Sequence, residues 1–332
     1  MAYRLKKGES VPAGIRRIVI GEIDSAIEGL EKCSRTNRDE AIHEARKSVK
    51  KVRGTLRLVR PELGKAFRDE NRRFRDLGHH LSELRDAQAI LEVFDSIAAQ
   101  YAGNLQKNAL TEIRYGIEAA KREKEQSIGI EKLIRTAVGT LRGAGKRVAG
   151  WPLQKDGFRA IAPGLKLTYR SGRKALAKAQ SDPHPLNYHD FRKRVKDHWY
   201  HIRLLESLWT EVQQARESSL HQLETWLGDD HNLVVLCDQL QKDPAKYGGP
   251  EHVQLFLALA AQHQKELREK SIALGQRVYE EKPRQFVQRM EKLWDAWRQD
   301  PKSMKELQKE QRNPPRKQAG KAASAKRVSA AS

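Results

Sequence analysis

The residues of this sequence that could do chemistry form a basic cluster that occurs twice. Residues 43–50 read HEARKSVK, and residues 189–196, which begin 146 positions later, read HDFRKRVK. In both copies a histidine is followed by Arg at the third, Lys at the fourth and Lys at the seventh position, which places all four on one helix face. Arginine and lysine donate charge-assisted hydrogen bonds to phosphate oxygens. The duplicated pattern therefore predicts a surface that binds a polyanion.

Each copy continues as a stripe along its helix, because Arg57 and Arg203 follow at the same offset. No stripe position is acidic, and like charges on one helix face repel. This favours a bound anion over the alternative, a charged face that is merely solvated. The candidate polyanion-binding residues are His43, Arg46, Lys47, Lys50 and Arg57 in the first stripe and His189, Arg192, Lys193, Lys196 and Arg203 in the second, with Tyr200 in the same strip.

Other cations lie on neighbouring elements. Candidates in comparable places near the start of each half are Arg16 and Arg17 in the first half and Lys166, Arg170 and Arg173 in the second. A further stripe consists of Arg72, Arg75 and His79, and its counterparts at the offset of 146 are mostly uncharged. For this last stripe, a solvated surface is an equally good explanation.

The elements that must position these residues are helices. Ala, Leu, Glu, Lys, Arg and Gln dominate the chain, and alternating runs of β-branched residues are missing, which predicts an all-α fold. Gly and Pro separate the expected helices. We expect helices over about 12–33, 38–59, 62–100, 104–127 and 131–149, and then over about 164–180, 187–209, 211–241, 251–278 and 283–310.

The domain organisation follows from the repeat and from composition. A Gly- and Pro-rich stretch from Gly143 to Gly164 is the expected seam between two helical repeats, residues 1–150 and 151–311. Residues 312–332 are rich in Lys, Arg, Ala, Ser and Pro and contain no carboxylate, which is typical of a disordered basic tail. The whole chain of 332 residues carries a net charge of +21, which implies attraction to polyanions.

The repeated motifs resemble those of the CHAD family, the conserved histidine α-helical domain. The resemblance is carried by the His-x-x-Arg-Lys-x-x-Lys copies at His43 and His189, and by the segment Leu81–Asp86 with its copy Leu227–Asn232. It spans about residues 10–300. It implies two four-helix bundles related by a pseudo-two-fold axis, with a basic groove or pore that binds inorganic polyphosphate. The Leu81–Asp86 segment and its copy are interpreted as structural.

The resemblance also implies a stand-alone binding protein. Some family members are fused to a domain that hydrolyses triphosphate and carries a Glu-x-Glu-x-Lys signature. The nearest string here, at residues 123–127, lacks the lysine and falls on an expected helix. We therefore expect no enzymatic activity, no cofactor and no metal site. Polyphosphate granules are the location that the resemblance implies.

Several alternatives stay open at this stage. A nucleic-acid-binding protein fits the charge and the tail, although no helix-turn-helix is evident and few aromatics are placed to stack on bases. An anionic membrane is a third possible partner. The N-terminal residues lack an apolar signal segment, and the longest apolar run, residues 255–261, is too short to span a bilayer, so we expect a cytoplasmic protein. Binding should strengthen below about pH 6.5 if His43 and His189 become protonated.

Overall fold

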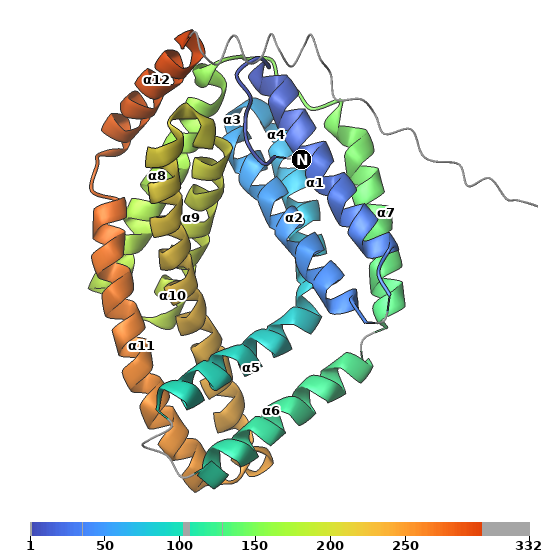
Figure 1. Cartoon of the computed structure of the whole chain (residues 1–332), viewed down its shortest axis with the longest axis vertical. Helices are drawn as coiled ribbons and strands as arrows, with labels where there is room; N and C mark the ends of the chain where they lie inside the picture. The colour runs from blue at the N-terminus through green and yellow to red at the C-terminus, as the bar shows by residue number, and fades with distance from the viewer. Residues whose placement is uncertain (1, 35, 102–106, 128, 301–332) are drawn as a thin grey trace, which may run out of the picture.

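The computed structural model is all-α, as the sequence predicts (Figure 1). It describes residues 2–34, 36–101, 107–127 and 129–300, with the side chains at 83–86, 107–109, 125 and 127 excepted. These residues form twelve α-helices, two short 3-10 helices and no strand. The helices are α1 Val11–Glu31, α2 Arg38–Leu58, α3 Arg60–Leu63, α4 Lys65–His80, α5 Ser82–Gln100, α6 Lys107–Ser127, α7 Ile130–Val148, α8 Phe158–Ser181, α9 Pro185–Leu204, η1 Glu206–Leu208, α10 Thr210–Lys242, η2 Pro244–Tyr247, α11 Pro250–Val278 and α12 Pro283–Gln299.

The single helix expected over residues 62–100 is wrong, because the chain divides it into α3, α4 and α5. Gly64 separates the first two with a φ of 52°, a conformation that glycine adopts at no steric cost. Leu81 forms the turn between α4 and α5 and is fully buried. The two turns redirect the chain, so that α5 leaves the α2 side of the molecule and reaches α10 (Figure 1).

The connection between the halves is shorter than the expected seam. Helix α7 continues through Gly143 and Gly145, and α8 begins at Phe158, so only residues 149–157 form the link. Pro163 lies inside α8 rather than before it. The helix still packs closely there, because the missing side chain of Gly164 lets α8 approach the backbone of Leu58 in α2; a Cβ at Gly164 would lie 1.9 Å from the Leu58 carbonyl oxygen.

Two groups of buried side chains stabilise the molecule. The larger combines α1, α2, α4 and α7 with α8, α9, α12 and the first half of α10. The smaller combines α5 and α6 with the second half of α10 and with α11. Both groups contain residues from both sides of position 150, and α10 takes part in each. The internal duplication into bundles at 1–150 and 151–311 stays a prediction, and the predicted tail at 312–332 lies outside the described residues.

Helices α2 and α9, which carry the two predicted stripes, cross near their C-terminal ends. Gly54 lies at the crossing, where an added Cβ would approach Tyr200 to 2.7 Å. These two residues are themselves 146 positions apart. The buried His201 bonds the Gly54 carbonyl oxygen through Nε2 at 3.0 Å. From this crossing α2 diverges from α9 and α10, and α5 passes between them at the other end (Figure 1).

An N-terminal strap, residues 2–10, lies against the crossing. Its Tyr3 and Leu5 are buried. The Leu5 amide donates to the Leu204 carbonyl at the end of α9, at 3.0 Å. The Tyr3 hydroxyl donates to the Lys51 carbonyl in α2, at 2.9 Å. The strap therefore bonds both crossing helices.

The strap also bonds the end of α12. The Lys7 amino group donates to the carbonyl of Asp300 at 2.5 Å, and the Arg298 guanidinium donates to the carbonyls of Lys7 and Glu9. The two ends of the described chain are thus adjacent. Across the described residues, no helix combines the length and apolar character that crossing a membrane requires.

Candidate polyanion-binding site

Four cations and one carboxylate meet beside the crossing. Arg46 and Lys50 come from α2, Arg192 and Lys196 from α9, and Glu224 from α10. The Lys196 amino group donates to Glu224 Oε1 at 2.6 Å, and the Arg192 guanidinium lies 3.2 Å from the same oxygen. We call these five residues the central cluster. The structure thus brings together the two halves of the duplicated pattern.

The field inside the central cluster is strongly positive. Burial alone would raise the pKa of Glu224, but Lys196 and Arg192 outweigh it and lower that pKa to about 2. Burial, with Lys196, Arg46 and Arg192 as neighbouring cations, lowers the pKa of Lys50 to about 7. Burial also lowers the pKa of Lys196, although Glu224 opposes the shift. The cluster therefore favours an additional anion, whose charge would stabilise its cations.

Lys47 and Lys193 form the exposed part of the stripes. Their side chains are 47% and 53% exposed. Each pairs with an acidic residue three positions earlier, Lys47 with Glu44 at 2.7 Å and Lys193 with Asp190 at 3.2 Å. Such exposed pairs are weak, so both amino groups can turn toward a ligand at small cost.

The two predicted histidines are half-buried. The rings of His189 and His231 lie against each other, with centroids 4.1 Å apart. Burial, Lys193 and Arg192 lower the pKa of His189, so this ring takes up a proton only at a lower pH than a free imidazole does. Asp229 lies near Arg192 and Glu224, and burial raises its pKa to about 6.

The far ends of the stripes are engaged in ion pairs between helices. Arg57 lies 3.1 Å from Asp197 of α9, and Arg203 lies 3.1 Å from Glu217 of α10. The Arg203 guanidinium also lies over the ring of Tyr3 in the strap. Tyr200 is buried at the crossing. These residues hold the helices at the closed end of the site.

The remaining candidates differ in what they contact. Arg16 donates to the Trp151 carbonyl, Arg17 to Glu9 and the Arg4 carbonyl, and Arg173 to the carbonyls of Glu280 and Glu281. Lys166 and Arg170 are exposed on α8. On α4, Arg72 pairs with Asp69 and Arg75 with Asp76, both at 2.9 Å, and His79 is exposed. The three backbone-bonding arginines connect loops to helices, whereas the others face solvent.

Sequence reasoning missed three residues of the site. The segment Leu227–Asn232, interpreted as structural, supplies Asp229 and His231. Its recurrence with the histidine motif was the signal that could have revealed them. Glu224 had no such signal, because the position 146 residues earlier is Gly78.

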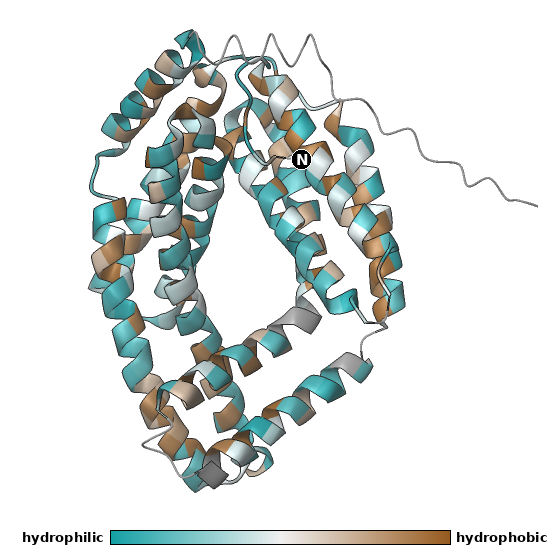
Figure 2. Ribbon diagram, in the orientation of Figure 1, coloured by the Kyte–Doolittle hydropathy of each residue, from teal (hydrophilic) through white to brown (hydrophobic). Residues whose placement is uncertain are grey.

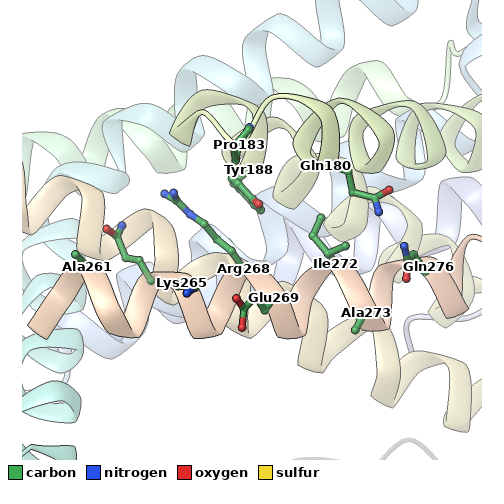
Figure 3. A pocket seen from close by; sticks show the side chains of 11 residues that line it. Gln180, Pro183, Tyr188, Ala261, Lys265, Arg268, Glu269, Ile272, Ala273 and Gln276 are labelled. Carbon is green, nitrogen blue, oxygen red and sulfur yellow. The ribbon is translucent and has the colours of Figure 1, made fainter.

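A separate groove lies on another face of the second half (Figure 3). Its volume is about 670 Å³, and it runs between α11 and the junction of α8 with α9. Arg268 in its wall lies 2.6 Å from the buried Asp230 and covers the ring of Tyr188. None of the predicted binding residues lines this groove.

The comparisons with known proteins agree with the all-α fold. Residues 23–241, well over half of the chain, match the family model of the CHAD domain. A solved structure, the crystal structure of the CHAD domain from the plant Ricinus communis, is similar with a TM-score of 0.59 and 18% sequence identity. The match covers 84% of this chain and 95% of that chain. At this identity the likeness shows the fold alone. No curated protein matches the chain.

Proposed function

Because the chain belongs to the CHAD family, we propose that it binds inorganic polyphosphate at the central cluster and along the stripes that lead from it. The observation that carries this proposal is the meeting of Arg46 and Lys50 with Arg192 and Lys196 around one carboxylate. Buried and half-buried cations gathered in one place are costly unless enough anionic charge joins them, and a polyanion would supply that charge. Hydrophilic residues also predominate along α2, α9 and α10 where their ribbons face one another (Figure 2).

Polyphosphate suits this arrangement chemically. It carries about one negative charge per internal phosphate and has no bases to read, so spaced cations suffice for recognition. Arginine can pair with phosphate oxygens through two parallel hydrogen bonds, and lysine supplies a mobile point charge. Lys47 and Lys193 directly follow Arg46 and Arg192, about 100° further around their helices, and would widen the contact sideways.

The proposed role is binding without hydrolysis. Phosphoryl transfer uses Mg²⁺ held by carboxylates. In the central cluster the cations outnumber the carboxylate, and this charge balance repels a divalent cation. The proposal extends to a location at polyphosphate granules, which co-localisation of a fluorescent fusion with stained granules would test.

The test is a binding titration with long-chain polyphosphate at about physiological salt. We expect the double variant Lys47→Ala, Lys193→Ala to weaken binding about thirtyfold, because each of the two phosphate contacts contributes on the order of 1 kcal/mol. The matched control is Arg135→Ala, Lys242→Ala. It removes the same charge from exposed cations that pair with acidic neighbours on α7 and α10. Equal loss in both variants would mean that only net charge matters, and the site assignment would fail.

Nucleic acid is the second candidate partner, and the basic tail favours it. Competition separates the two. Double-stranded DNA should not displace polyphosphate from the full chain, and removal of residues 312–332 should leave polyphosphate affinity within about threefold, since the central cluster is intact. If the full chain binds both polymers equally well, and removal of residues 312–332 abolishes this binding, the tail and not the central cluster is the binding site.

A further inference from the structure

We propose that Glu224 is a positioning residue of the polyphosphate site, which holds Arg192 and Lys196 side by side and keeps the amino groups of the central cluster charged. This inference rests on the proposed function. It adds an acidic residue to a site whose predicted members are all basic or aromatic.

The geometry around one oxygen atom carries the first part. Glu224 Oε1 accepts from the Lys196 amino group at 2.6 Å and from Arg192 Nε at 3.3 Å. Arg192 and Lys196 are four positions apart on α9, where two like charges repel. The shared oxygen holds both side chains in one orientation. Glu224 is only 8% exposed, so solvent does not weaken this contact as it does at the surface.

Helix α10 is shaped to admit Arg192 beside this carboxylate. Gly228 follows Glu224 by one turn, and a Cβ there would lie 3.0 Å from Arg192 Nη2. The guanidinium therefore lies against bare backbone on one side and the Glu224 carboxylate on the other. A Cβ at residue 228 would push the guanidinium aside by a few tenths of an ångström.

The two halves are unequal at this point. The position that corresponds to Glu224 in the first half is Gly78, which contributes no carboxylate to Arg46 and Lys50. Burial and three neighbouring cations lower the pKa of Lys50, whereas the Glu224 carboxylate raises it. The charge of Lys50 on α2 therefore depends on a carboxylate of α10. One acidic residue thus serves cations from both stripes.

The surroundings of Lys50 define how its charge responds to pH. Arg46 faces it from its own helix, Arg192 and Lys196 from α9, and Glu224 from α10. Among the described residues of α1 and α4, two polar groups bond other residues of α2 than Lys50. Glu22 of α1 bonds Ser48 and Lys51, and Asn71 of α4 bonds Arg53.

A wild-type amine with a pKa of about 7 is partly charged at neutral pH, and an arriving polyanion completes its protonation. Without the Glu224 charge, the same amine would need a lower pH to become charged. Affinity should therefore fall as pH rises, and it should fall earlier in Glu224→Gln than in the wild type.

The experiment compares polyphosphate affinity of the wild type and Glu224→Gln from pH 5.5 to 8.5 at constant ionic strength. Glutamine keeps the shape and one acceptor but removes the charge. We expect Glu224→Gln to bind at least as tightly as the wild type at pH 5.5, where the amines are charged and one repelling carboxylate is gone. At pH 8 we expect it to bind about tenfold more weakly, the effect of a one-unit change in the pKa of Lys50.

Two further variants complete the design. Lys50→Arg, which stays charged throughout, should flatten the profile between pH 6 and 8. Asp238→Asn is the matched control, because it removes an exposed carboxylate of α10 that pairs with Lys242, and its profile should follow the wild type. If Glu224→Gln binds more tightly at every pH, with a profile parallel to the wild type, Glu224 is only a competitor of the ligand and the proposal is wrong.

A measurement without ligand separates this inference from the proposed function. The ¹³Cε resonance of Lys50, identified by its loss in Lys50→Arg, reports the protonation of the free amine. We expect its midpoint near pH 7 and a lower midpoint in Glu224→Gln. Equal midpoints would contradict the inference. Lower midpoints in a protein that binds no polyphosphate at any pH would leave the role of Glu224 standing and overturn the proposed function.

Discussion

At the scale of single residues, the cations of the two stripes fall into two kinds. Lys47 and Lys193 are about half exposed and pair with acidic residues of their own helices, whereas Arg192 and Lys196 are largely buried and bond a carboxylate of another helix. A ligand can recruit the first kind freely. The second kind also stabilises the contact between α9 and α10, so its removal affects both folding and binding.

Replacement of Arg192 should therefore reveal this double role. We expect Arg192→Ala to lower the free energy of unfolding by about 2 to 3 kcal/mol, because it removes a partner from the buried Glu224. Lys193→Ala, one position further along, should stay within about 0.5 kcal/mol of the wild type. Urea denaturation monitored by circular dichroism measures both. Equal stability of the two variants would show that the Arg192–Glu224 contact does not stabilise the fold.

How far the sequence predicts the site depends on where each residue lies. The stripe residues share a helix and a repeat, so their common face follows from helical periodicity. Glu224 lies 28 positions beyond Lys196 in the chain, on another helix. Its approach is determined by tertiary packing, which periodicity within one helix does not encode.

At the scale of helices, glycine determines how closely α2 and α9 approach. The missing side chain of Gly54 is what allows the ring and Cβ of Tyr200 to lie against α2. The sequence predicts both helices from their composition. The crossing could not be predicted, because Gly54 is indistinguishable in sequence from helical glycines that touch nothing.

A pair of glycine substitutions tests this interpretation. We expect Gly54→Ala to lower the free energy of unfolding by about 2 kcal/mol or more, because the new Cβ would force α2 and α9 apart. Gly139→Ala in α7, where a Cβ would have no neighbour within 4 Å, should raise it by about 0.5 to 1 kcal/mol through better helix propensity. Thermal and urea unfolding provide the comparison. Stabilisation by Gly54→Ala would contradict the close crossing.

At the scale of the whole molecule, buried histidines link stability to pH. His198 and His201 are completely buried. Burial lowers the pKa of His201 to about 3 and that of His198 well below its usual value. Both rings are therefore neutral in the folded protein, whereas they take up protons in the unfolded chain below about pH 6.5. The unfolded state binds more protons as the pH falls from 6.5 toward 3, so stability decreases over that window.

Substitution of His198 should weaken this dependence. Neither ring nitrogen of His198 has a hydrogen-bond partner in the part of the chain that the structure describes, and the ring packs against Tyr169, Tyr279 and Phe286. We expect His198→Phe to reduce the stability lost between pH 7 and pH 5 by about 2 kcal/mol. Urea unfolding at the two pH values measures it. The control is His80→Gln, at an exposed histidine. If His198→Phe loses as much stability between pH 7 and pH 5 as the wild type does, His198 is not a source of the pH dependence.

The bond between Lys7 and Asp300 also has a consequence for the order in which the protein folds during synthesis. Its partners are 293 residues apart, so a ribosome adding roughly 5 to 20 residues per second completes the second partner roughly 15 to 60 s after the first. The second buried group likewise waits for α10 and α11 before α5 and α6 can be covered. Until α10 and α11 have been made, the apolar faces of α5 and α6 are exposed in the nascent chain, and a chaperone that shields them would act before the strap closes.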